Sequence, residues 1–253
     1  MRRWVAYVLA IPVVAVVVAP FLYMVVAGLM AGRDGLTALP LERFAVTSAI
    51  FTVTVAAGQV VTSAAAAYAF ARLRFAGRDR LFLAYLSTLA APTILLVIPR
   101  YLLIDALGWV DRYRGLITTE LVSVAGIFLL RQFFRTLPRE LEDAARLEGA
   151  GEWTVFRRVV LPQSGPALAT LAVLAFVEQW RSFLWPLVAT QATSMQVMEV
   201  GITNLRGLYV VSWSQQMAVA AVTLAPVLVV LLVARKHVIR ATEWTPIGSS
   251  APT

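Results

Sequence analysis

The chain has 253 residues, of which 60% are hydrophobic, whereas soluble domains hold roughly 45–50% apolar residues. Its formal net charge is +8, but the arginines flank apolar runs instead of forming one basic face, so we expect no nucleic-acid partner. The chain lacks cysteine and has one lysine, Lys236, which excludes disulfides, thiolate chemistry, a cysteine metal site and a G-x-x-x-x-G-K-[ST] phosphate loop.

Long uncharged runs indicate an all-α integral membrane protein with six transmembrane helices. A backbone inside a bilayer must satisfy its own hydrogen bonds, and these runs are much longer than the about 10-residue strands of a barrel. The first run, between Arg3 and Arg33, exceeds the about 7–15 apolar residues of a signal peptide and predicts a retained span. The six predicted spans cover about residues 4–32, 46–71, 81–99, 115–130, 164–187 and 208–234.

Two of the predicted spans carry unusual features. Pro92 breaks the third span and Pro99 ends it, which predicts either a bent helix that lines a path or a kink packed against its neighbours. The fourth span is the weakest, because it is short and contains Glu120. We expect residues 100–114 to form an amphipathic link and residues 191–207 to form a polar connection.

A polar island, ELEDAARLEGAGEWTVFRRVVLP at residues 140–162, separates the fourth and fifth predicted spans. Its apolar side chains at helical spacing predict one short helix before Gly149 and Gly151 and a second after them, which Pro162 ends. Two short helices joined by a glycine bend between membrane spans favour a docking surface for another protein.

The distribution of basic residues predicts the orientation of the chain. Six spans place both termini on one side, together with the polar island and the link between the second and third spans. The positive-inside rule puts this side in the cytoplasm, because it carries most of the basic residues. They are Arg2, Arg3, Arg72, Arg74, Arg78, Arg80, Arg131, Arg135, Arg139, Arg146, Arg157, Arg158, Arg235, Lys236 and Arg240, against Arg33, Arg43, Arg100, Arg112, Arg114 and Arg206 outside.

Charged and aromatic residues of the fifth span are candidates for a translocation path. Glu178 and Arg181 are three residues apart and share a helix face, although a charge near mid-membrane costs roughly 2.5–3.5 kcal/mol. They either line a path near a polar or anionic solute or neutralise each other as an ion pair. Gln59 could serve the path or join helices, and Trp180 and Trp185 could stack on sugar rings or anchor at the membrane interface.

The polar island resembles the EAA loop of ABC-importer permeases, with Asp143-Ala144-Ala145 at the E-A-A position and Gly149 three residues beyond Arg146. That loop is the family's contact with its ATPase subunits. Asp143 stands where the family has glutamate, and is one methylene shorter. The resemblance therefore implies an ATPase-docking set of Glu140, Leu141, Asp143, Ala144, Ala145, Leu147, Glu148, Gly149, Ala150, Trp153 and Phe156.

Nearly the whole chain resembles the second, G-type permease subunit of carbohydrate ABC importers of the maltose and glycerol-phosphate kind. AYAFARLRFAG at residues 67–77, FLLRQFFRTLP at 128–138 and WRSFLWP at 180–186 are similar to family segments in the same order. The family has asparagine where Arg181 stands. The resemblance implies one transmembrane domain over residues 1–253, with five core spans at about 46–235 and a cytoplasmic coupling loop at 136–162.

The resemblance also implies partners and a location. We expect a bacterial plasma membrane subunit that pairs with a homologous second permease, docks two cytoplasmic ATPases and receives solute from an extracytoplasmic binding protein. The solute would be a sugar, an oligosaccharide or a glycerol-phosphate-like molecule. This chain would carry no catalytic residue, metal or cofactor, since ATP and magnesium would bind the ATPases. The alternatives are a self-contained secondary transporter and a membrane scaffold that transports nothing.

Overall fold

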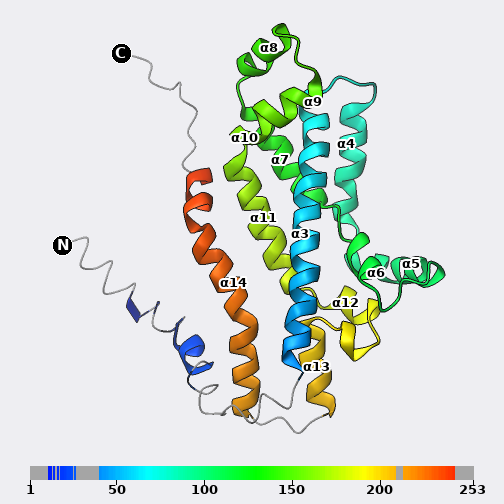
Figure 1. Ribbon diagram of the computed structural model, residues 1–253, viewed down its shortest axis with the longest axis vertical. Helices are drawn as coiled ribbons and strands as arrows, with labels where there is room; N and C mark the ends of the chain where they lie inside the picture. Colours follow the sequence, from blue (N-terminus) through cyan, green and yellow to red (C-terminus); the bar gives the residue numbers. More distant parts are fainter. Residues whose placement is uncertain are drawn as a thin grey trace.

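The computed structural model describes residues 40–208 and 213–242, together with 11, 12, 14, 16, 18–24 and 26. Most of the first predicted span and the residues after 242 lie outside the described part of the chain. Within that part, every regular element is a helix and no strand occurs (Figure 1). The predicted all-α class is therefore confirmed for the described residues.

The bundle is built around α3, a 32-residue helix from Leu41 to Arg72. Figure 1 shows α7 and α11 beside α3, with α14 packed on α11. Buried side chains recur at helical spacing along α3, from Phe44 through Val55 to Ala71, because this stripe faces its neighbours. The predicted second span is thus a continuous helix. The other long members of the bundle are α7 (Val124–Thr136), α11 (Gly165–Trp180) and α14 (Trp213–Thr242).

Small residues allow these helices to approach closely. A Cβ added at Gly126 on α7 would lie 2.7 Å from the Ser63 Oγ on α3 and 3.0 Å from a methyl group of Leu171 on α11. A larger residue at this position would displace the Ser63 and Leu171 side chains. The small-residue content of the predicted second span therefore serves helix packing, as it does in other membrane bundles.

The third predicted span is not one continuous helix. The chain forms α4 (Arg78–Ser87), a 3-10 turn η1 (Thr88–Ala90) and α5 (Thr93–Ala106), and bends by 100° between them. Pro92 precedes α5 in an extended conformation and has no amide hydrogen to continue the earlier helix. The prediction that Pro99 ends the span is wrong, because Pro99 lies inside α5.

The fourth predicted span is also interrupted. A short helix α6 (Tyr113–Thr118) is followed by a non-helical segment at 119–123, and only then does α7 begin. Polar side chains of α3 satisfy the carbonyl groups that this break frees: Gln59 Nε2 donates to the Glu120 carbonyl and Thr62 Oγ1 to the Leu121 carbonyl, each at 2.8 Å. The interruption of the helix is therefore stabilised by specific hydrogen bonds from α3.

The remaining elements correct the predicted boundaries. The helix of the fifth span, α11, ends at Trp180, and α12 (Leu184–Ala189) is a separate short helix. The predicted polar connection at 191–207 contains the 3-10 turn η3 (Thr193–Met195) and most of the helix α13 (Met198–Leu208).

Among the described residues, two helical stretches are long and apolar enough to cross a membrane. They are Leu41–Arg72 and Gln215–Ala234 within α14, and the number rises to four if each of two bent helix pairs counts as one span. One pair is formed by α4 and α5, and the other contains α11. The count of six spans stays a prediction.

Candidate functional site

The polar island folds into a string of short helices at one end of the bundle (Figure 1). We call residues 140–163 the docking element. Gly149 has φ +87°, a backbone conformation that a residue with a Cβ rarely adopts, and it forms the predicted bend between the first two helices. The docking element comprises α8 (Glu140–Leu147), α9 (Glu152–Val155), the π-helical turn η2 (Phe156–Val160) and α10 (Leu161–Gln163).

The second helix runs without a gap through α9, η2 and α10 and ends at Gln163, one residue after the predicted end at Pro162. Pro162 has no amide hydrogen for a helical bond, which agrees with a helix end at this point. The chain turns at Ser164, and α11 leaves the docking element at an angle of 78°. The docking element thus continues directly into α11 through this bend.

The outward side of the docking element exposes large apolar side chains among charged ones. Leu141, Leu147 and Trp153 are 54%, 90% and 69% exposed, although each is a large hydrophobic residue. Exposed apolar side chains gathered on a small element mark an interaction surface. The docking residues Glu140, Asp143, Ala144, Glu148 and Gly149 are also exposed, so most of the predicted docking set faces outward.

The inward side of the docking element belongs to the core of the chain. Phe156 is 6% exposed and its ring lies 4.9 Å from the ring of Tyr68 on α3. Ala145 and Ala150 are partly buried against the same cluster. Phe156 belongs to the predicted docking set, but it faces inward, and the Tyr68 ring already covers its ring.

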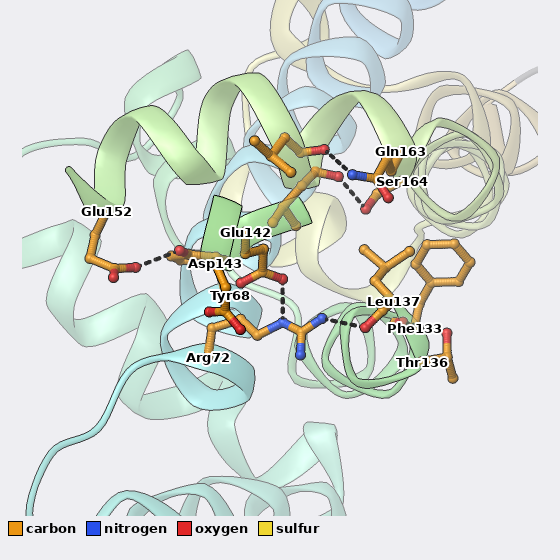
Figure 2. A network of polar contacts seen from close by, with 12 residues as sticks. Tyr68, Arg72, Phe133, Thr136, Leu137, Glu142, Asp143, Glu152, Gln163 and Ser164 are labelled. Carbon is orange, nitrogen blue, oxygen red and sulfur yellow. Dashed lines mark hydrogen bonds and ion pairs between the residues drawn. The ribbon is translucent and has the colours of Figure 1, made fainter. Parts of the chain in front are cut away.

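A buried ion pair joins the docking element to α3 (Figure 2). The Arg72 Nε lies 2.9 Å from Glu142 Oε1, and the two side chains are only 3% and 2% exposed. These two atoms are at ion-pair distance without the angle of a hydrogen bond. The second Arg72 nitrogen donates to the Leu137 carbonyl at 2.8 Å, so Arg72 holds both α8 and the segment that leads into it.

A second contact lies beside this pair. The Tyr68 hydroxyl donates to Glu152 Oε2 at 2.6 Å, which ties α9 to α3 (Figure 2). Arg146 donates to Glu152 Oε1 at 2.9 Å and so links the two short helices across the glycine bend. The hydrogen bonds from Arg146 and Tyr68 hold the pKa of Glu152 below its usual value. The docking element is therefore fixed to α3 at two carboxylates.

The acid at the motif position behaves differently from its neighbour. The Asp143 side chain is 63% exposed and accepts a hydrogen bond from Arg146 at 2.9 Å. The buried carboxylate belongs to Glu142, which is absent from the predicted docking set. Sequence spacing gave no sign of this burial, because a glutamate on a polar helix is ordinarily solvated and its partner, Arg72, lies far away in the chain.

The candidate path residues fall into two groups. Glu178 and Arg181 are exposed, and no ion pair joins them in the described part of the chain. The predicted mutual neutralisation is thus absent, because Arg181 lies beyond the last turn of α11. Trp180 and Trp185 are 5% and 4% exposed, so neither ring is free to stack on a sugar or to anchor at the interface.

The buried candidates join helices together. The Trp180 indole donates to the Thr223 carbonyl on α14 at 2.9 Å, and the Trp185 indole donates to the Leu116 carbonyl on α6 at 3.0 Å. Gln59 on α3 donates a hydrogen bond to the Glu120 carbonyl in the non-helical segment before α7. All three side chains therefore join helices, which for Gln59 was one of the two predicted roles.

An ion pair missed by sequence reasoning lies close to Trp185. The Arg100 guanidinium on α5 donates to the Glu120 carboxylate and, at 2.8 Å, to Thr119 Oγ1. It also lies 4.0 Å from the centre of the Trp185 ring. The two charges are remote in sequence, and only the 100° bend before α5 and the break before α7 bring them together.

Comparisons with known proteins agree with this architecture. Residues 1–243 match the profile of a family described as "Binding-protein-dependent transport system inner membrane component". A similar solved structure is that of a bacterial ABC transporter involved in the import of the acidic polysaccharide alginate, with a TM-score of 0.80 at 20% identity. The match covers 92% of this chain and 94% of that chain, and it supports the fold.

Two curated relatives are named sn-glycerol-3-phosphate transport system permease protein UgpE. The relative from Agrobacterium fabrum is 33% identical over 210 residues, which are 82% of this chain and 74% of the relative. The relative from Yersinia pestis is 32% identical over 223 residues, which are 87% of this chain and 79% of the relative. The chain belongs to the family of inner membrane components of binding-protein-dependent transport systems.

Proposed function

We propose that this permease subunit forms half of a translocation path, pairs with a homologous second permease and is driven by two cytoplasmic ATPases. The observation that carries the proposal is the two-sided character of the docking element. Its outer side exposes Leu141, Leu147 and Trp153, while its inner side is fixed to α3 through Glu142 and Glu152. Such an element can receive a partner and pass on the partner's movement.

The coupling follows from these attachments. Closure of the ATPases around ATP would displace the docking element as a lever. The Arg72–Glu142 pair would carry this displacement to α3, and the bend at Ser164 would carry it to α11. Because α3 and α11 pack against each other, a small shift of both would exchange outward and inward access to the path.

The orientation and the solute belong to the same proposal. The positive-inside rule supports six spans with both termini and the docking element in the cytoplasm of a bacterial cell. An extracytoplasmic binding protein would deliver a sugar, an oligosaccharide or a glycerol-phosphate-like solute. The UgpE relatives support the last of these, and the exposed Glu178 and Arg181 would line the path for a polar solute.

Reconstituted transport tests the proposal. The two permeases and the ATPases are inserted in proteoliposomes with ATP inside, and the binding protein is first screened by thermal shift against sugars and glycerol phosphates. We expect uptake of the stabilising solute only with hydrolysable ATP and the ATPases. Uptake driven by an ion gradient without the ATPases would favour a secondary transporter. Absence of uptake from a fully assembled complex would favour the scaffold alternative.

A further inference from the structure

A cavity of about 640 Å³ lies between the docking element and the end of α3. Its polar walls are four arginines and three carboxylates, contributed by α3, by the segment that follows it, by Arg139 and by α8 and α9. Arg72 engages Glu142, and Arg146 engages both Asp143 and Glu152. All three carboxylates of the cavity therefore already have a cationic partner.

The other two arginines of the cavity have none. Arg74 and Arg139 are exposed, and no carboxylate among the described residues lies within ion-pair distance of either. Arg139 immediately precedes α8, and Arg74 lies in the turn after α3. Both residues line the cavity beside the docking element, which therefore has a surplus of positive charge.

A second cavity, of about 680 Å³, extends this surplus. It shares Arg74 and Arg139 with the first cavity and adds the first residues of α4. Its single carboxylate, Asp79, is engaged by Arg78 and by Arg131. Arg74 and Arg139 thus line both cavities, and every carboxylate in these cavities is already paired with another arginine.

We propose that Arg74 and Arg139 bind carboxylate side chains of the ATPase subunit, on the flank of the surface that the docking element presents. This inference rests on the proposed function. A guanidinium binds a carboxylate through two parallel hydrogen bonds, and two adjacent unpaired arginines recognise an acidic pair or cluster. Asp143 and Arg146 form part of the same cavity wall, so an acidic side chain that enters it meets the docking element directly.

The positions of the two arginines favour a protein acid over a lipid phosphate. Arg139 belongs to the link that leads into the docking element, and the docking element itself forms one wall of the first cavity. A headgroup held there would occupy space beside the surface onto which the ATPase closes. The partner is therefore an acidic patch on the ATPase, next to the site that takes Leu147 and Trp153.

Binding measurements test the inference. The assembled permease pair is placed in nanodiscs of phosphatidylcholine, and the affinity of the purified ATPase is measured across a range of salt concentrations. We expect Arg74→Gln with Arg139→Gln to weaken binding roughly tenfold at low salt, as two exposed ion pairs would, and to flatten the salt dependence. Arg43→Gln, an exposed arginine at the opposite end of α3, is the matched control and should change neither quantity.

Three outcomes would overturn the inference or separate it from the proposed function. Unchanged affinity and salt dependence in the double variant would show that the arginines touch no acid of the ATPase. An effect that appears only when the nanodiscs contain anionic lipid would assign the arginines to lipid phosphates. If Leu147→Ser loses binding and the arginine variants do not, the docking element still binds the ATPase. The proposed function would then stand, and only the contact through Arg74 and Arg139 would be rejected.

Discussion

At the residue scale, two neighbouring acids on α8 have opposite roles. Glu142 is buried against Arg72, whereas Asp143 is exposed and is held only by Arg146. Removal of one partner from a buried pair leaves an uncompensated charge, which costs about 3–5 kcal/mol. An exposed pair contributes only about 0–1 kcal/mol. The acid that maintains the fold is therefore not the acid at the motif position.

We expect Glu142→Gln to lower the detergent-stable yield and the thermal midpoint of the permease, because Arg72 would remain buried without a counter-charge. Asp143→Asn should leave both unchanged and reduce solute-coupled ATPase activity. Size-exclusion yield, thermal unfolding and ATPase assays measure these effects. Replacement of the pair by Arg72→Met with Glu142→Leu should restore the yield. An equal loss of stability in both single variants would contradict the distinction.

Glu178 and Arg181 give a second prediction at this scale. Because the structure shows no ion pair between them, Glu178→Gln and Arg181→Gln should each leave the detergent-stable yield unchanged. If they line the path, at least one substitution should reduce uptake. The double variant should then transport no better than the weaker single variant. Loss of yield in the single variants with rescue in the double variant would restore the neutralising pair.

At the element scale, the bend at Gly149 is the feature that periodicity and glycine placement predicted correctly. Its φ of +87° favours glycine, and no atom lies within 4 Å of the position that a Cβ would take. A side chain at this position would therefore cost about 1–3 kcal/mol through backbone strain and not through a steric clash. Gly151 has φ −72° and equally open space, so it supplies a control in the same loop.

We expect Gly149→Val to uncouple transport while the chain still inserts and assembles, because only the angle between α8 and α9 changes. Gly151→Val should retain coupling, since valine tolerates its backbone conformation. The measurement is the ratio of solute uptake to ATP hydrolysis in proteoliposomes. Normal coupling in Gly149→Val, or equal loss in both variants, would reject the bend as the transmitting element.

Elements whose partners are local were predictable, and elements whose partners are distant were not. Helical spacing along α3 and glycine placement in the docking element carry their own signals in sequence. The break at 119–123 depends on donors from Gln59 and Thr62, on a different helix. The burial of Phe156 likewise depends on Tyr68, so a pattern read along one segment could not reveal it.

At the scale of the whole molecule, the chain offers a direct test of its orientation. It contains no cysteine, so a single introduced thiol is the sole labelling site. Leu147 in the docking element is 90% exposed, and Ala192 is exposed near the opposite end of the bundle. α3 joins these two ends, because Arg72 contacts the docking element and Ser48, near the other end of α3, accepts a hydrogen bond from the Met198 amide.

Leu147→Cys should react with a membrane-impermeant maleimide only in inside-out vesicles, and Ala192→Cys only in right-side-out vesicles. The reason is the excess of arginine around the docking element, which the positive-inside rule assigns to the cytoplasm. Added ATPase should protect Leu147→Cys from the reagent and leave Ala192→Cys unaffected, because only the first thiol lies on the proposed docking surface. Labelling of both thiols from one side would show that α3 does not separate two aqueous compartments, and the proposed topology would then be wrong.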